Sequence, residues 1–347
     1  MSTVLPIIRR RPGLSLIVWL FVSATLAADT GIGVKLAGTR ILRGDRLVIE
    51  VMDPDSPERY NRGTRFTPVA NVLRATLEGR EFLHAPGGPG HDPLLDNGGL
   101  ASEFDLFAHT PPPGFAEAAI GEDYVKIGVG VLRKTAERYD FWEVPPVVAR
   151  AVTSTSWGKD RATFEQVCEG TNGYSYRLAA GVRVEGDGLE ITFGLTNTGA
   201  KRFSTWHYAH NFFAFDGAMT GPGYEVQFPY ELPPLILQTG SPRTQTQRGR
   251  RIVFIEALKE SSNVQVPWPA DYDGPNWVRL RQVESGRQIT ATTSMPGPFI
   301  FVHADSRYVC PEQFVRLDLK PGESAGWSRS YRFEVVSPAD KPTPAHE

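Results

Sequence analysis

Hydrophobic and polar residues alternate along much of this chain. Between residues 174 and 184 every second side chain is hydrophobic, and the same pattern recurs in 125–131, 189–195, 315–319 and 331–335. Strict alternation is typical of antiparallel strands that bury one face. Turn sequences punctuate these stretches, namely EGRE at 78–81, EGDG at 185–188, NTG at 197–199 and KPGE at 320–323. The pattern predicts an all-β protein.

Helical periodicity is almost missing from the sequence. Only GFAEAAIGED, residues 114–123, indicates a short helix. The 34 glycines and 28 prolines fit many tight turns and long loops. We find no internal repeat and no linker, so the chain predicts either one large antiparallel sandwich or two small ones.

The N-terminus has the layout of a secretory signal. Three arginines, residues 9–11, precede an apolar run from Leu14 to Leu26 that ends in small residues. The run is short for a membrane span, which needs about 20 apolar residues, but an uncleaved anchor is the alternative. We therefore expect a signal peptide at 1–28, one domain at 29–340, a disordered tail at 341–347, and a periplasmic or secreted protein.

Charge and cysteine content narrow the function classes. The formal net charge is only −2, which gives no basis for a nucleic-acid partner. Once the signal is cleaved, no stable membrane insertion is expected, and the sequence does not predict the oligomeric state. Cys168 and Cys310 are the two cysteines. Export permits a disulfide between them, and two buried thiols are the alternative.

Residues 206–217, WHYAHNFFAFDG, contain a conspicuous group of aromatic and polar side chains. On a strand, Trp206, Tyr208 and His210 share one face, whereas His207 and Asn211 lie on the other. Because the two histidines point apart, we expect neither a metal site nor a cofactor. A histidine packed in an aromatic core is the alternative for His210.

A second candidate segment lies near the C-terminus, in RYVCPEQFVRLDLKPGESAGWSRSYRF at 307–333. Alternation places Glu312, Phe314 and Arg316 on one face of the strand. Glu312 follows Cys310 and Pro311 at the start of this strand, a position suited to the edge of a cleft. A solvent-exposed polar face is the alternative.

Together these segments resemble the aldose 1-epimerase, or galactose mutarotase-like, superfamily. AHNFFAF at 209–215 is similar to the strand that carries the family's catalytic histidine. VCPEQF, LKPGES and SYRF, within 309–333, follow the order of the segment that carries its catalytic glutamate. NVLRATLEGREFL at 71–83 and GLTNTG at 194–199 resemble earlier family hairpins. The resemblance implies a large antiparallel β-supersandwich with long loops, with His210 and Glu312 as catalytic residues.

The chain also departs from the family pattern. The region NGGLASEFDLFAH, 97–109, has no His-Gly motif, and Glu103 or His109 are candidates to lie nearby. The family's sugar-clamping arginine has no clear counterpart, and Arg65 is the candidate. Further candidates for substrate binding are Trp206, Tyr208, Asn211 and Arg316.

The resemblance implies a sugar substrate, either a mono- or an oligosaccharide. A carboxylate and a histidine on the two sides of the C1–O5 bond suffice to interconvert anomers. The same pair is also compatible with an epimerase, lyase or hydrolase, since a fold does not fix a reaction. A carbohydrate-binding protein without catalytic activity is the third alternative.

Overall fold

The computed structural model describes residues 35–85, 87, 90–105, 110–241, 243–295 and 297–336. The expected signal peptide at 1–28, His109 and the tail at 341–347 lie outside these residues. The described residues belong to one compact unit that starts at Gly31. Their regular secondary structure is entirely β. In this part of the chain, no helix has the length and apolar character needed to cross a membrane.

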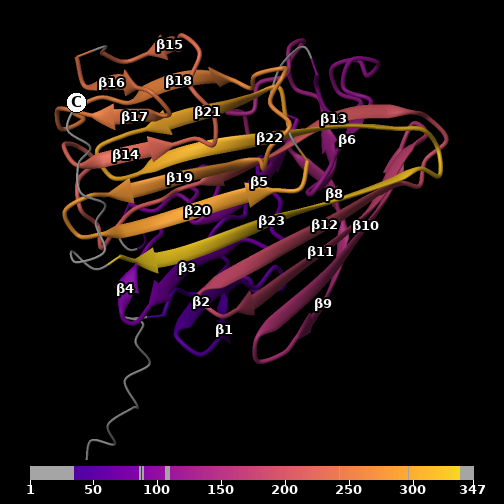
Figure 1. Ribbon diagram of the computed structural model, residues 1–347. Coiled ribbons are helices and arrows are strands. Elements are labelled where there is room, and N and C mark those ends of the chain that lie inside the picture. Colours follow the sequence, from indigo (N-terminus) through magenta and orange to yellow (C-terminus); the bar gives the residue numbers. More distant parts are fainter. Residues whose placement is uncertain are drawn as a thin grey trace, which may run out of the picture. The chain divides into compact units, whose positions relative to one another are not determined.

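The described residues form two ten-stranded sheets and one three-stranded sheet (Figure 1). The first sheet contains, in spatial order, β1 (Thr39–Arg43), β2 (Leu47–Met52), β3 (Val72–Leu77), β5 (Leu100–Phe104), β13 (Phe203–Asn211), β22 (Val309–Leu319), β21 (Phe299–Ala304), β18 (Ser262–Pro267) and β15 (Ile236–Thr239). The short strand β4 (Arg80–Glu81) pairs with β3.

The second sheet contains, in spatial order, β16 (Gln245–Arg248), β17 (Arg251–Phe254), β14 (Tyr224–Gln227), β19 (Trp277–Gln282), β20 (Arg287–Thr293), β23 (Ser324–Val335), β12 (Gly188–Asn197), β11 (Tyr174–Glu185), β10 (Arg161–Thr171) and β9 (Val152–Trp157). The third contains β6 (Asp123–Lys126), β7 (Gly130–Arg133) and β8 (Val147–Arg150). Neighbouring strands run antiparallel throughout.

The predicted alternation accounts for the core. Along β11, Tyr176, Leu178, Ala180 and Val182 are buried, and the residues that alternate with them are half-buried or exposed. One continuous cluster of buried hydrophobic residues includes members of both ten-stranded sheets. Burial of each large side chain of this kind stabilises the fold by about 1.5–3 kcal/mol. The all-β expectation is confirmed, and the two large sheets form one sandwich rather than two.

The short helix expected at 114–123 is wrong. The chain follows turns there and then enters β6. Gly114 and Gly121 have positive φ angles of 83° and 91°, which a right-handed helix does not accommodate. The residues between them are too few to nucleate an isolated helix in water.

Strand register determines which side chains share a face beside β13. Tyr208 pairs with Glu103 of β5 on one side and with Phe314 of β22 on the other. The same antiparallel register, extended by two residues, places Glu312 opposite His210. Residues from three strands far apart in sequence therefore meet on one face of the first sheet.

Candidate active site

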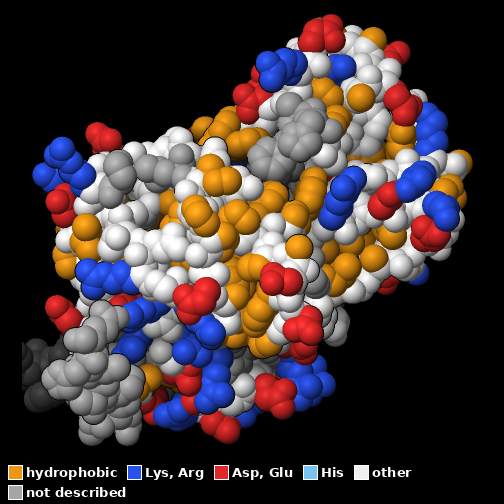
Figure 2. All heavy atoms as spheres, turned by 45° about the horizontal axis from the view of Figure 1, so that its top comes forward, with side chains coloured by type: hydrophobic (Ala, Val, Ile, Leu, Met, Phe, Trp, Pro, Cys, Tyr) orange, Lys and Arg blue, Asp and Glu red, His pale blue; other side chains and the backbone are white. Residues whose placement is uncertain are grey.

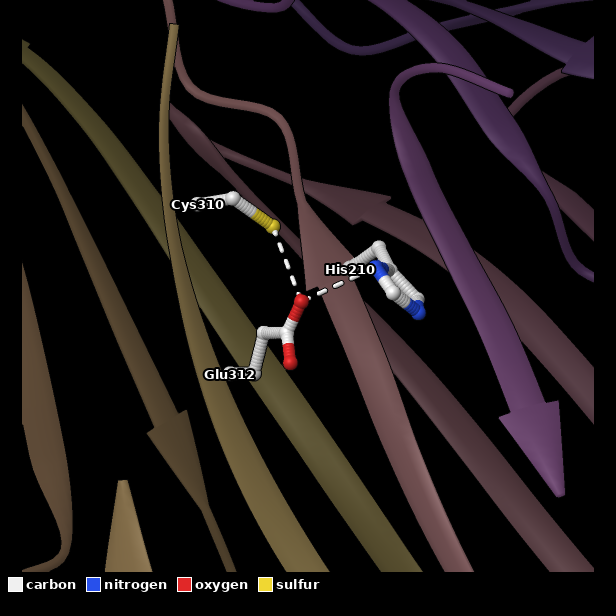
Figure 3. Close-up of side chains that lie close together, drawn as sticks. All are labelled: His210, Cys310 and Glu312. Atoms are coloured by element: carbon white, nitrogen blue, oxygen red, sulfur yellow. Dashed lines mark hydrogen bonds and ion pairs between the residues drawn. The ribbon is translucent and has the colours of Figure 1, made fainter. Parts of the chain in front are cut away.

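His210 and Glu312 form the centre of the candidate site. Nδ1 of His210 lies 2.9 Å from Oε1 of Glu312, and each side chain is only 10% exposed. The Cys310 thiol donates to the same carboxylate oxygen across 3.6 Å. Figure 3 shows the Glu312 carboxylate between the thiol and the imidazole, which come from β22 and β13. Three groups able to exchange protons or bind cations therefore converge here.

A second carboxylate lies at the other side of the imidazole. Nε2 of His210 is 3.1 Å from Oε2 of Glu103. Because carboxylates face both ring nitrogens, the arrangement favours the doubly protonated ring, in which both nitrogens donate. Burial acts to lower the pKa of His210, but the charge of Glu312 and the hydrogen bonds to both carboxylates outweigh it and raise the pKa. His210 is therefore held as a proton donor.

Glu103 itself is fully buried but remains ionised. Oε2 accepts hydrogen bonds from Nε of Arg65 at 2.7 Å and from the hydroxyl of Tyr208 at 2.5 Å. Burial acts to raise the pKa of Glu103, but the charges of Arg65, His210 and Lys126 lower it to about 2. A buried carboxylate with this many partners is a fixed negative charge that orients the imidazole.

The pair opens into a cavity of about 670 Å³. Its lining includes His210 and Glu312, and also polar and aromatic side chains from distant segments, among them Arg65, His84, His91, Phe141, Trp142, Phe212, Asn263, His303, Arg307 and Tyr308. Figure 2 turns the top of the view in Figure 1 forward. Hydrophobic side chains gather across the middle of that face, with charged ones mainly toward its margins. A largely apolar cavity with a few convergent polar groups is typical of small-molecule sites.

The same groups are the candidate ligands for a metal ion. One ligand atom from each of His210, Cys310 and Glu312 lies within 4.8 Å of the others. Thiolate, imidazole and carboxylate are the ligands that Zn²⁺ prefers. However, burial raises the pKa of the Cys310 thiol well above its usual range, so the thiol stays protonated without a cation. That the protein needs no metal or cofactor stays a prediction.

The structure brings together five of the sequence-predicted site residues. His210, Glu312, Glu103, Arg65 and Tyr208 form one connected set of hydrogen bonds and ion pairs. Arg65 also lines the cavity. Glu103 comes from the region that has no His-Gly motif, and it brings a carboxylate to His210.

Trp206 shares a face of β13 with His210, and Arg316 shares a face of β22 with Glu312. Both lie farther along their strands. They are direct partners in the β13–β22 ladder, and the Arg316 guanidinium lies 5.7 Å from the Trp206 ring. The fully buried rings of Tyr208 and Phe314, stacked with centroids 4.6 Å apart, lie between this pair and the His210–Glu312 pair. The prediction that Trp206 and Arg316 bind substrate is therefore not supported by their position.

Asn211 corrects another expectation. Its side chain donates to the carbonyl of Pro311 at 2.6 Å and accepts from the Tyr331 hydroxyl at 2.9 Å, and the residue is fully buried. The reason is the strand period: Asn211 follows His210 directly and points into the sandwich. His207 also faces inward, as its strand position predicts, and its Nδ1 accepts from Nε1 of Trp327 at 2.9 Å.

Several cavity residues were missed at the sequence level. His303 follows Phe299 and Phe301 in the alternation of β21, and this signal was available in the sequence. His84 comes just after β4, and its Nε2 is buried without a hydrogen-bond partner among the described residues. Burial, helped by Arg307, lowers the pKa of His84, so this ring is neutral. Only the tertiary structure places it beside Tyr308, with ring centroids 5.3 Å apart.

Comparison with known proteins identifies the fold. No protein-family model matches the sequence, and no curated protein matches it. Solved structures do match. A protein from Synechocystis sp. PCC 6803 is 12% identical with a TM-score of 0.54, over 86% of this chain and 96% of that one. A galactose mutarotase related enzyme from Lactobacillus acidophilus is 11% identical with a TM-score of 0.53, over 86% and 98%.

A galactose mutarotase-like protein from Clostridium acetobutylicum is 12% identical with a TM-score of 0.53, over 85% of this chain and 95% of that one. Identities this low show a shared fold and nothing finer. The chain has the galactose mutarotase-like fold across most of its length, as its sequence segments indicate.

Proposed function

We propose that this protein is an exported aldose 1-epimerase that interconverts the anomers of a sugar by acid–base catalysis. The observation that supports it most strongly is the contact of 2.9 Å between Nδ1 of His210 and the Glu312 carboxylate in the wall of the cavity. Mutarotation needs one base and one acid at two oxygens bonded to the same carbon, C1. An acid and a base within hydrogen-bonding distance of each other have the spacing for this task.

Glu312 is the base in this proposal. A sugar that enters the cavity places its C1 hydroxyl between the two side chains and replaces their direct contact. Glu312 accepts the C1 hydroxyl proton while His210 donates the proton on Nδ1 to the ring oxygen. The C1–O5 bond breaks, its electron pair stays with O5, and C1 becomes an aldehyde carbon. Each proton transfer contributes about 10²–10⁴-fold.

Ring closure reverses these steps on the other face of the aldehyde. Rotation about the C1–C2 bond presents the second face, the O5 hydroxyl attacks C1, and its proton returns to His210. Glu312 returns its proton to the new C1 oxygen. Glu103 takes part without exchanging a proton, because it stays ionised and compensates the imidazolium charge at Nε2.

The export part of the proposal depends on the N-terminal signal layout in residues 1–28. A fractionation experiment tests it separately. The full-length chain, expressed in a bacterial host, should appear in the periplasm with an N-terminus near Ala28 or Asp29. A chain found uncleaved in the cytoplasm or membrane would overturn the export proposal and leave the catalytic one intact.

The catalytic proposal is tested by NMR exchange spectroscopy on the purified protein with galactose, glucose and their disaccharides. Accelerated exchange between the α and β C1 signals, lost in Glu312→Gln, supports a mutarotase. New product signals from an oligosaccharide would instead support a lyase, hydrolase or epimerase on the same scaffold. Binding without either change would support a carbohydrate-binding protein.

A further inference from the structure

An exposed tryptophan lies at the rim of the catalytic cavity. Trp142 is 62% exposed, in contrast to the buried aromatic residues beside His210. It nevertheless lines the same cavity as His210 and Glu312, together with Phe141 and the half-exposed Leu95. Large apolar side chains left open to water beside a cavity are typical of a binding surface.

The position of this tryptophan is fixed by its surroundings. The guanidinium of Arg65 lies 4.5 Å from the centroid of the Trp142 ring and 4.2 Å from that of Phe141. The backbone nitrogen of Trp142 donates to Oδ1 of Asp140 at 2.9 Å. Arg65 in turn is paired with Glu103. The exposed ring is thus connected to the catalytic histidine through the half-buried Arg65 and the fully buried Glu103.

The charges around the cavity favour a ligand without charge. Arg65 is paired with Glu103, Arg307 with Asp305 at 3.0 Å, and His210 with Glu312. Among the described residues of the lining, each arginine therefore already has a carboxylate partner. Burial lowers the pKa of His84 and His303, so these rings act as neutral hydrogen-bonding groups. Among these described lining residues, a sugar phosphate or a uronic acid would find no unpaired arginine.

The size of the cavity exceeds the need of one monosaccharide. Its volume of about 670 Å³ lies within the range of roughly 300–1,000 Å³ that holds ligands of drug size, which are larger than a hexose. The catalytic pair and Trp142 both line this cavity, and Arg65 and Glu103 connect them. A pyranose has a flat face of C–H bonds, so a second sugar ring can stack on an exposed indole.

We propose that Trp142 forms a subsite for a second, uncharged sugar residue, so that the protein acts on the reducing end of a neutral oligosaccharide. The reducing-end residue lies at His210 and Glu312, and the next residue stacks on the Trp142 ring. The proposal rests on the proposed function for the identity of the first position. The subsite itself follows from the exposed ring, the paired charges of the lining and the cavity volume.

The test compares glucose with maltose, cellobiose and lactose, three disaccharides that all have glucose at the reducing end. For each sugar, kcat/KM for anomer exchange and Kd by calorimetry are measured in the wild type, Trp142→Ala and a control. The control is Met219→Ala, which removes another exposed hydrophobic side chain, 65% exposed, outside the described cavity lining.

We expect at least one disaccharide to exceed its monosaccharide in kcat/KM and affinity by about two- to tenfold, the range of one good aromatic contact. In Trp142→Ala this ratio should fall to about one, whereas Met219→Ala should keep the wild-type ratio. Equal values for mono- and disaccharides in the wild type would overturn the subsite, and so would an unchanged ratio in Trp142→Ala.

The two proposals fail in different ways. If no sugar exchanges faster but a disaccharide binds more tightly than its monosaccharide through Trp142, the catalytic proposal is wrong and the subsite stands. If both sugars exchange equally fast and bind equally well, mutarotation stands and the subsite is wrong. If none of these sugars binds, both are overturned.

Discussion

Nδ1 of His210 and Oε1 of Glu312 lie 2.9 Å apart because their strands, β13 and β22, are neighbours in register. The ladder that pairs Tyr208 with Phe314 leads to this contact two residues later. Neither side chain depends on a loop for its position. The acid and the base of the proposed reaction therefore both lie on strands of the first sheet.

Replacing Glu312 by glutamine tests the base directly. The amide keeps the shape of the side chain but cannot accept a proton, so we expect exchange to slow by about 10²–10⁴-fold. The variant should still fold, because the amide can hydrogen-bond His210. Glu185→Gln, an exposed glutamate in β11, is the matched control. If Glu312→Gln unfolds in circular dichroism and thermal denaturation while its native fraction keeps full activity, Glu312 is a structural residue and its assignment as the base is wrong.

The pH dependence tests the acid. Reaction requires protonated His210, whose pKa is raised because Glu312 and Glu103 outweigh the effect of burial. Activity should therefore persist above the usual histidine pKa and fall as pH rises through the raised value. The stability contribution of this proton has the same sign: it is fully present below about pH 6.5 and is lost as pH rises through the folded-state pKa.

Glu103→Gln separates the effect of the His210 pKa on activity from a general loss of activity. Removing one of the two carboxylates next to His210 lowers the histidine pKa, so the alkaline decline of kcat/KM should move to lower pH. We also expect a loss of about 3–5 kcal/mol in unfolding free energy, because Arg65 loses its buried partner. A profile of kcat/KM against pH that coincides with the wild type would show that Glu103 does not position or charge the imidazole.

Much of this arrangement was predictable from sequence periodicity. The alternation of hydrophobic residues predicted the all-β sandwich and the face that carries His210. It also placed His207 in the interior, where the structure finds it fully buried. These predictions succeed because the two faces of a half-buried strand differ strongly in hydrophobic free energy, and a shift by one residue would reverse them.

The sequence could not show how far along its strand each side chain lies from the cavity. Trp206 shares the face of His210, but the stacked rings of Tyr208 and Phe314 separate it from the contact between His210 and Glu312. Nor could periodicity find Trp142 or His84, because loops and strand ends carry no repeating pattern. Their places depend on long-range contacts such as that between Arg65 and Glu103, which are 38 residues apart.

The cysteine beside the proposed catalytic pair predicts sensitivity to Zn²⁺. Both cysteines are free and buried, so the disulfide alternative is not realised, and only Cys310 lies next to Glu312. Incubation with a chelator should leave exchange activity unchanged, because the proposed steps use no metal. Added Zn²⁺ should inhibit by binding His210, Cys310 and Glu312, with a Kd measurable by calorimetry.

Cys310→Ser should weaken Zn²⁺ binding by about tenfold or more, since a hydroxyl is a poor zinc ligand, whereas Cys168→Ser should keep the wild-type affinity. Activity that disappears on chelation and returns with zinc would overturn the metal-free reaction. Equal zinc affinity in wild type and Cys310→Ser would show that the ion binds elsewhere.

His207 provides the converse test, because its role is structural. Its ring is fully buried, and burial together with Arg329 lowers its pKa well below the usual value, so it accepts a hydrogen bond as a neutral ring. His207→Ala leaves a cavity and removes the acceptor for Nε1 of Trp327. We expect a loss of about 2–4 kcal/mol in unfolding free energy, measured in urea, with kcat/KM close to wild type.

Trp327→Phe removes the donor of the same hydrogen bond and keeps an aromatic ring beside Phe193, whose centroid lies 5.4 Å from that of Trp327. Combined with His207→Ala, it should cost less than the two single changes added together, because the indole N–H that would lose its acceptor is then also removed. A fall in activity with unchanged stability in His207→Ala would place this histidine in the site and reverse the assignment of faces along β13.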